Sequence, residues 1–276
     1  MKYNPTDVSR FWFVQTEDLR TTPSMDYHEH SKISQYLFDY RPEDPKKTDV
    51  MINRINALAG KSKDYSCYEG HPLHARDWST LDADIGPLLE QRRTRRDINS
   101  YTIPNEDVAT LLVRALGVNG ELPLNNGETR PLRAHPSGGG LFPLETYAFI
   151  LDADDLPSGL HHFDPYGPQF RLLDGGDFRD ELSAIFMNDP MLDNASMVIV
   201  LSGVFMRSRF KYAERGYRFV LLEAGHMMQN LILVGQALDL SVVPLGGYID
   251  RRLESLMNID GVEESVVYTA VVGKLG

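Results

Sequence analysis

The chain has 276 residues, of which 42% are hydrophobic, and a formal net charge of -11 at pH 7. This length and hydrophobic content suffice for one large domain or two small ones with a buried core. The acidic balance argues against nucleic acid or an anionic membrane as a general partner, because both bind positive protein surfaces. The one cysteine, Cys67, excludes an intramolecular disulfide and a cysteine zinc site, and it is typical of a reducing compartment.

The first 80 residues are expected to form an extension that packs on, or docks from, the rest of the chain. They are polar and aromatic-rich, with weak periodicity and no Gly/Ser linker after them. The aromatic residues Phe11, Trp12 and Phe13 form either a docking surface or part of the core, and the core is favoured. The opening residues lack an uninterrupted apolar stretch and a cleavage site, so we expect no signal peptide and a cytoplasmic protein.

Residues 81–276 are expected to form the main domain, which begins with two helices. Residues 85–91 carry apolar side chains at helical spacing and lead into the run QRRTRRD. The run IPNEDVATLLVRALG predicts a second helix, with Asn105 as its N-cap, acidic residues in its first turn and Gly117 after its end.

The rest of the domain mixes strands and helices. LETYAFILD and SMVIVLSGVF predict strands, the second apolar enough for burial on both faces, and GLHHFDPYGPQFRLLD predicts a hairpin that turns at residues 164–167. DFRDELSAIFM predicts a helix, and SVVPLGGYID and ESVVYTAVVGK predict the last strands. This order of elements shows neither the regular βαβ alternation of a Rossmann fold nor the repeats of a solenoid, so the predicted fold class is α+β.

Residues 217–240, YRFVLLEAGHMMQNLILVGQALDL, predict a long helix that is apolar nearly all round. It is long enough to cross a bilayer, but its charged and amide residues favour the central buried helix of a globular core. Glu223, His226 and Asn230 share one side of this helix. They either contact a ligand or satisfy neighbouring backbone groups, and His226 by itself is more simply a core histidine.

Three further segments carry residues suited to binding an anionic ligand. RRTRRD, residues 92–97, could clamp a phosphate with its guanidinium groups or could be a solvated basic face. PSGGGLFP, residues 136–143, could bring backbone N–H groups close to a ligand or could be a plain turn, and it lacks Rossmann and P-loop spacing. PLGGY, residues 244–248, is a second glycine turn. The pairs in HEH and in His161–His162 lack zinc spacing, so no metal site is expected.

The stretch RSRFKYAERGYR, residues 207–218, places adjacent Lys211 and Tyr212 among four arginines. A lysine in water is mostly protonated and a poor base. Crowding by Arg207, Arg209 and Arg215 in a dry pocket would disfavour its charge and make it a better one. The alternative is a cationic helix start that balances nearby acids.

Taken together and in this order, these segments resemble the nitroreductase superfamily of flavin enzymes. The matching features are the RRSxR-like run at residues 92–96, the PS glycine loop, a GxxxQN helix from Gly225 to Asn230 and the late glycine pair. FKYAERGYRFVLLEAGHMMQN and PSGGGLFPLE, with YHEHSK further upstream, are similar to the SagB/McbC-type dehydrogenase branch. The resemblance covers residues 85–276 well and the first 80 only loosely.

The resemblance implies a nitroreductase-like fold, in which helices flank an antiparallel or mixed central sheet around a long buried central helix, and a homodimer with FMN in the subunit interface. It implies that Lys211 and Tyr212 are the catalytic pair. The FMN-binding residues that it implies are Arg92, Arg93, Thr94, Arg96, Pro136, Ser137, Gly138, Gly139, Glu223, Gln229, Gly246, Gly247 and Lys274.

For the branch, the implied activity is oxidation of azoline rings to thiazoles or oxazoles in a peptide natural product, with an azoline-containing peptide as substrate and a cyclodehydratase complex as a further partner. Lys211 is then the expected base and Tyr212 its partner, although the roles could be swapped. An NAD(P)H-dependent nitro- or flavin reductase is an alternative, disfavoured because LFPLE stands where ordinary nitroreductases have a QPW-like sequence. A non-catalytic docking subunit is the third possibility.

Overall fold

The computed structural model describes residues 23–33, 61–81, 84–124 and 127–276, in two compact units that comprise residues 1–42 and 43–276. In the first unit, α1 (Pro23–His30) has no buried residue. Phe11, Trp12 and Phe13, with their two expected roles, lie outside the described residues. In the second unit β1 (Gly70–Pro72) pairs with the main sheet, so the last part of the expected extension belongs to the same unit as the main domain.

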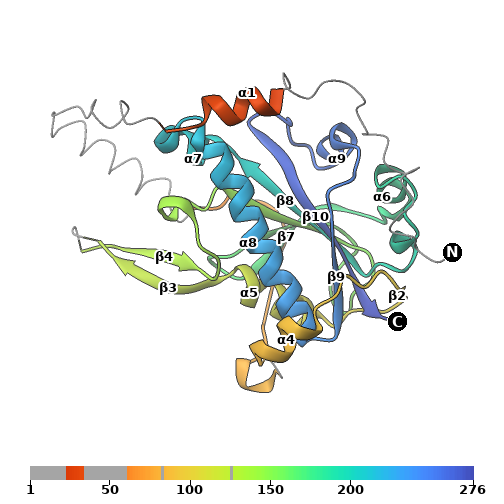
Figure 1. Ribbon diagram of the computed structural model, residues 1–276. Coiled ribbons are helices and arrows are strands. Elements are labelled where there is room, and N and C mark those ends of the chain that lie inside the picture. Colours follow the sequence, from red (N-terminus) through yellow and green to blue (C-terminus); the bar gives the residue numbers. More distant parts are fainter. Residues whose placement is uncertain (1–22, 34–60, 82–83, 125–126) are drawn as a thin grey trace. The chain divides into compact units, whose positions relative to one another are not determined.

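An eight-stranded antiparallel sheet forms the centre of the second unit (Figure 1). Its strand order is β1-β7-β6-β5-β8-β10-β2, and β9 pairs with β10 beside this path. The strands after β1 are β2 (Ile98–Asn99), β5 (Leu144–Ile150), β6 (Gly159–Asp164), β7 (Gln169–Gly175), β8 (Met197–Val204), β9 (Leu240–Leu245) and β10 (Glu264–Leu275). A separate hairpin joins β3 (Val118–Pro123) to β4 (Thr129–Arg133). The predicted α+β class and the predicted hairpin of β6 and β7 are confirmed.

Helices cover both faces of the sheet. Within the described residues of this unit, the α-helices are α4 (Ile85–Gln91), α5 (Asn105–Leu116), α6 (Arg179–Ile185), α7 (Met206–Tyr212), α8 (Arg215–Ala237) and α9 (Asp250–Leu256). α5 and α8 contribute to one apolar cluster with the sheet, and α6 and α9 contribute to the other. Figure 1 shows α7 at one end of α8 and α4 near the other end.

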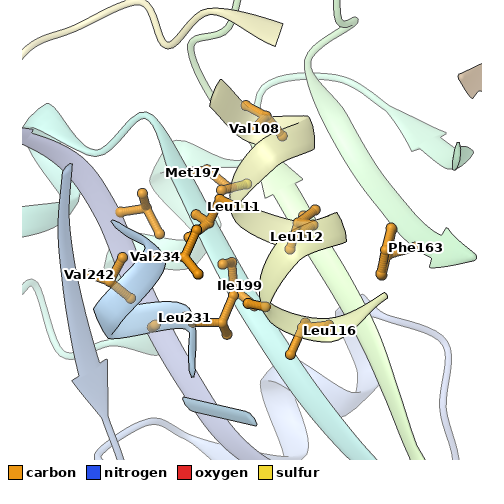
Figure 2. Packing of buried hydrophobic residues seen from close by; sticks show 14 of the residues in the cluster. Val108, Leu111, Leu112, Leu116, Phe163, Met197, Ile199, Leu231, Val234 and Val242 are labelled. Atoms are coloured by element: carbon orange, nitrogen blue, oxygen red, sulfur yellow. The ribbon is translucent and has the colours of Figure 1, made fainter. Parts of the chain in front are cut away.

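The strand β8 is buried on both faces, as its apolar run predicts. Ile199 belongs to the cluster with α5 and α8, whereas Val198 and Val200 belong to the cluster with α6 and α9. This alternation follows from the two-residue period of a strand. Figure 2 shows Leu111 of α5 and Leu231 of α8 meeting the β8 side chains from one side.

The helix α5 is present as predicted, but its predicted N-cap is wrong. Asn105 is the first helical residue, and Pro104 takes the cap position with no side-chain hydrogen bond. The Pro104 carbonyl already accepts the N–H of Val108 at 3.1 Å, so the first turn closes one residue earlier than the asparagine predicts. Gly117 ends the helix as expected, and its N–H donates to the carbonyl of Val113.

The long helix α8 spans 23 residues, as the sequence predicts, but it is buried on one side only. Val220, Met227 and Leu231 face the core, whereas Leu222 is 60% exposed. Helix α5 and the sheet lie along one side of it, and the opposite side is exposed in the single chain. His226 is exposed, so its interpretation as a core histidine is wrong. Among the described residues no helix combines the length and the apolar character needed to cross a membrane.

Candidate active site

The corner between α7 and α8 presents Lys211 and Tyr212. Helix α7 ends at Tyr212, and Ala213 turns the chain with a φ of 46° before α8 begins. Gly216 permits this close approach, because a Cβ there would lie 2.8 Å from the backbone nitrogen of Arg209. The catalytic pair predicted from the sequence therefore lies half-buried at the end of a short helix that packs closely against α8.

Each glycine of the triple-glycine loop faces a different side chain. At Gly138 the Cβ position lies 3.2 Å from the Phe219 ring, and at Gly140 it lies 3.2 Å from Nη2 of Arg130. At Gly139, whose φ is +69°, the Cβ position lies 2.6 Å from both Lys211 Nζ and Tyr212 Oη. The loop is therefore a close-approach surface, and the plain-turn interpretation does not account for it.

Lys211 and Tyr212 point to the same side. The lysine Nζ lies 5.0 Å from the centroid of the Tyr212 ring. The tyrosine ring in turn packs edge-on against Phe219, with 4.8 Å between the ring centroids. A proton relay between the two side chains requires this common orientation.

Two of the three arginines expected to crowd Lys211 are neutralised by carboxylates. Arg207 Nη1 lies 2.6 Å from Oε1 of Glu145, and Arg209 Nη2 lies 2.5 Å from Oε1 of Glu214. For these two arginines the structure shows the balancing of nearby acids that the alternative interpretation predicts.

Arg130 is a cation at this site that the sequence did not point to. It is half-buried on β4, beside Gly140, and its buried Nε has no hydrogen-bond partner among the described residues. Only the pairing of β3 with β4 brings it to the loop, so no sequence signal could have found it.

Glu145 of β5 is a second group that sequence reasoning missed. This buried carboxylate accepts hydrogen bonds from Ser62 Oγ at 2.7 Å, from the Lys63 backbone N–H at 2.9 Å and from His162 Nε2 at 2.8 Å. Burial by itself would raise the pKa of the Glu145 carboxyl, but the hydrogen bond from His162 and the charge of Arg207 outweigh it and lower this pKa to about 2. Glu145 is therefore ionised at neutral pH.

A neighbouring buried carboxylate, Glu264 at the start of β10, extends this polar network. It lies 2.6 Å from Lys63 Nζ and accepts hydrogen bonds from Tyr147 Oη at 2.9 Å and Ser202 Oγ at 2.6 Å. Burial and the charge of Glu264 raise the pKa of Tyr147, which keeps its phenol protonated. Residues 62 and 63 thus bind both buried carboxylates of the sheet.

The arginine run lies near the other end of α8. The cavity there, of about 470 Å³, is lined by Arg93, Arg95, Ser241 and the last turn of α8. Arg95 belongs to the predicted arginine clamp but not to the FMN ligands that the family resemblance implies. Arg92 and Arg96 are half-buried outside the lining, and Thr94 is exposed. The lining also includes two carboxylates, Asp84 and Asp239.

Lys274 and the glycine pair Gly246–Gly247 lie along β9 and the strand that pairs with it, β10. Lys274 pairs in register with Leu240 at the start of β9, and its Nζ lies 4.0 Å from a carboxylate oxygen of Asp239. Gly246 and Gly247 are exposed just beyond β9, about 16 Å of strand further on. No described atom lies within 4 Å of the Cβ position of Gly246, so space remains there for a ligand.

Within one chain, the predicted site residues form two groups. Phe219 contacts the glycine loop and Gln236 lines the arginine cavity, and these two residues of α8 are 17 positions apart, which corresponds to about 26 Å along the helix. One group comprises Pro136, Ser137, Gly138, Gly139, Lys211 and Tyr212. The other comprises the residues 92–96 and Lys274. The structure therefore does not bring the predicted phosphate clamp to the predicted catalytic pair of the same chain.

The polar residues of α8 divide between core and surface. Glu223 is buried with His135, with 3.3 Å between Oε1 and Nε2, and burial lowers the pKa of His135 although Glu223 opposes this shift. Asn230 donates to the carbonyls of Ala115 at 3.1 Å and Ala134 at 3.4 Å, as the backbone-satisfying alternative predicts. Gly225 and Gln229 are exposed.

The two adjacent histidines of β6 have separate partners. His162 binds Glu145, whereas the ring Nε2 of His161 donates to the carbonyl of Pro157 at 2.9 Å. Their side chains thus point to opposite faces of the strand, as expected. Within the described ranges, no cluster of three or more histidine, cysteine or acidic side chains could hold a metal ion.

Comparison with known families decides the assignment. The model of the nitroreductase family matches residues 89–274. The chain belongs to the nitroreductase family. As a nitroreductase-family member it is an oxidoreductase, and membership supports flavin binding in general.

Three curated relatives are similar to this chain over part of its length. The putative nitroreductase MJ1384 of Methanocaldococcus jannaschii is 27% identical over 62% of the chain and 83% of the relative. The microcin B17-processing protein McbC of Escherichia coli is 28% identical over 46% of the chain and 49% of the relative. The trifolitoxin-processing protein TfxB of Rhizobium leguminosarum is 26% identical over 62% of the chain and 48% of the relative. The chain thus spans about half the length of the two peptide-processing relatives, and they confirm the resemblance to the SagB/McbC-type branch.

Solved structures confirm the nitroreductase-like fold. A putative nitroreductase from Anabaena variabilis superimposes with a TM-score of 0.68 at 24% identity, over 91% of this chain and 46% of that one. The Escherichia coli microcin synthetase McbBCD, solved with truncated pro-MccB17 bound, superimposes with a TM-score of 0.57 at 20% identity, over 93% of this chain and 95% of that one.

Proposed function

We propose that this chain is an FMN-dependent azoline dehydrogenase that converts azoline rings of a peptide to thiazoles or oxazoles. The observation that carries the proposal is the meeting of Lys211 and Tyr212 over Gly139. The similarity to two peptide-processing proteins supports a peptide as substrate. A cyclodehydratase complex is a proposed further partner, because one structural neighbour is a microcin synthetase complex with a propeptide bound.

The residues at the arginine end fit the phosphate of FMN. Arg93 and Arg95 offer guanidinium donors at the cavity, and such groups bind phosphate oxygens bidentately. Lys274 adds a cation on the adjoining strand, and exposed Gly246 and Gly247 leave room along the edge of the sheet for a flat ring. FMN, when bound, would accept a hydride from the azoline.

The pair at Gly139 supplies the acid–base chemistry. Azoline oxidation also requires loss of a ring proton alpha to a carbonyl, and we assign its removal to Lys211 Nζ, with Tyr212 Oη holding or relaying the proton. Both atoms converge on one point of the loop, in the space that a side chain at Gly139 would otherwise occupy.

Arg130 is the proposed counter-charge for this step. Removal of the proton places negative charge on the substrate carbonyl oxygen, and a fixed cation nearby lowers the energy of that state. Arg130 lies beside Gly140, the residue that follows Gly139 in the loop, and its Nε has no hydrogen-bond partner among the described residues. We expect Arg130→Gln to lower azole formation by tenfold or more without loss of FMN, and equal rates in the two proteins would reject this role.

A homodimer would unite the two groups of site residues. The outward side of α8 carries exposed Leu221, Leu222, Gly225 and Gln229, and large apolar side chains on such a surface favour association. Twofold packing that sets two copies of α8 antiparallel would bring the arginine end of one chain toward the glycine loop of the other. This arrangement accounts for the roughly 26 Å separation within one chain.

The test combines a visible spectrum of the purified protein with aerobic addition of a thiazoline peptide and mass analysis. Flavin bands and loss of two hydrogens from the peptide are expected, with Lys211→Met and Tyr212→Phe reducing the rate by at least a hundredfold and Lys61→Met serving as a control lysine. Flavin without this oxidation, together with rapid bleaching by NADPH, would identify a reductase instead. Undiminished azole formation in both variants would reject the catalytic pair.

A further inference from the structure

We propose that Glu145 is a positioning residue for the Lys211–Tyr212 pair and that it acts through Arg207. This inference rests on the proposed role of the pair. Glu145 lies on β5, which follows the glycine loop, and Arg207 lies on α7, which carries the pair at its end. The ion pair between them is therefore a direct link from the sheet to the catalytic helix.

The link is short and mostly shielded from water. Arg207 Nη1 lies 2.6 Å from Glu145 Oε1, and the two side chains are 13% and 1% exposed. Arg207 precedes Lys211 by four residues, so the two side chains lie on one side of α7. By holding the guanidinium group of Arg207, the ion pair restrains the rotation of α7 about its axis. It also sets the net charge of the side chain one helical turn before Lys211.

The carboxylate is itself held from three directions. Ser62, the Lys63 backbone and His162 occupy its oxygens, and these partners come from two other segments of the chain. Removing its charge would leave Arg207 shielded and uncompensated, which is unfavourable. Residues 62 and 63, upstream of the family match, are in this way connected to the catalytic helix.

The other charged groups around these two positions are also largely compensated. Near Glu145, Lys63 Nζ pairs with Glu264, and beside Lys211, Arg209 pairs with Glu214. Arg215 and Arg130 remain as cations near the corner, each with a buried Nε that has no described hydrogen-bond partner. Because substitutions at Glu145 or Arg207 leave these neighbours unchanged, a difference at Lys211 between such variants and the wild type reports on the Glu145–Arg207 pair.

Chemical labelling of lysines tests this dependence without requiring enzyme activity. The purified full-length protein is treated briefly with acetic anhydride at a series of pH values, and acetylation of Lys211 is measured by mass spectrometry. The labelling midpoint is compared in the wild type, Glu145→Gln, Arg207→Met and the double variant. Lys274 serves as the internal control, because it lies near the other end of α8.

The two single variants should shift the midpoint in opposite directions. Glu145→Gln leaves the arginine charge uncompensated, so the Lys211 labelling midpoint should fall, whereas Arg207→Met leaves the carboxylate uncompensated, so this midpoint should rise. The double variant should return to the wild-type value. The Lys274 midpoint should stay constant, and cooperative melting should show that each variant is folded.

Activity gives the second readout. Azole formation by Glu145→Gln should fall at least tenfold at saturating substrate with FMN retained, and its pH–rate profile should move in the same direction as the labelling midpoint. Unmoved Lys211 labelling in both folded single variants, or a shift of the same sign in both, would overturn the inference. If the wild type forms no azole, the proposed function fails, but the labelling result still decides the role of Glu145.

Discussion

Lys211 Nζ and Tyr212 Oη each lie 2.6 Å from the position that a Cβ of Gly139 would occupy. Two adjacent residues at the end of a helix thus converge on a single backbone position of a distant loop. The convergence depends on the turn at Ala213, whose φ of 46° ends α7, and on the φ of +69° at Gly139. The loop, the helix end and the pair form one unit.

Gly139→Ala should therefore abolish most azole formation. The methyl group would meet both catalytic atoms, and the positive φ adds backbone strain that L-residues avoid. We expect a fall of at least a hundredfold in kcat/KM with the fold retained. Gly120→Ala is the matched control, because no described atom lies within 4 Å of its Cβ position. Steady-state rates for both variants, with circular dichroism spectra, measure the effect, and a Gly139→Ala enzyme as active as the control would contradict it.

FMN affinity should depend on Arg93 and Arg95. A charge-assisted hydrogen bond contributes about 1.5–3 kcal/mol, so replacing both by glutamine should weaken FMN binding by a hundredfold or more. Fluorescence titration of flavin-free protein with FMN measures the dissociation constant. Arg252→Gln provides an exposed arginine on α9 as the control. If the double variant binds FMN as tightly as Arg252→Gln does, the cavity is not the phosphate site.

Leu222→Glu should weaken the proposed dimer. A charge placed at a side chain that is 60% exposed on the outer side of α8 would have to be desolvated in a subunit interface, whereas in a monomer it would cost little. Light scattering after size exclusion should show a shift from dimer to monomer together with loss of FMN. Val262→Glu, at a residue that is 67% exposed, is the control. A wild-type monomer that binds FMN tightly would argue against a shared site.

The sequence predicted those elements whose pattern is local. The two-sided burial of β8 and the ends of the hairpin of β6 and β7 follow from apolar runs and turn residues that lie within a few positions of each other. The N-cap of α5 was missed because asparagine is a favoured cap residue, whereas in the structure Pro104 takes the cap position without a side-chain hydrogen bond and Asn105 is the first helical residue.

The candidate site could be predicted only in its parts. Lys211, Tyr212 and the glycine loop stand out as local motifs, and the structure brings them together. Arg130 lies in no motif, and it reaches the glycine loop through the fold of β4. Glu145 ends the PSGGGLFPLE motif, but its ion pair with Arg207 arises from the packing of α7, which lies about 60 residues further along the chain. Periodicity also cannot show which side of an all-apolar helix is left uncovered, so the exposed side of α8 was missed.

Acid should destabilise the protein through His161. Burial lowers the pKa of this imidazole to about 4, only partly opposed by its hydrogen bond to the Pro157 carbonyl. The pKa of a histidine in the unfolded chain is about 6.5, so the unfolded state binds this proton more readily than the folded state does. The contribution of His161 to the free energy of unfolding is therefore fully present above pH 6.5 and is lost as the pH falls from 6.5 toward 4. The loss between pH 7 and pH 5 should be about 2 kcal/mol. Urea unfolding at the two pH values measures it. The His161→Leu variant has no ionisable group at this position. Between pH 7 and pH 5 its free energy of unfolding should therefore fall by about 2 kcal/mol less than that of the wild type. Equal pH dependence in the two proteins would mean that His161 does not carry the acid sensitivity.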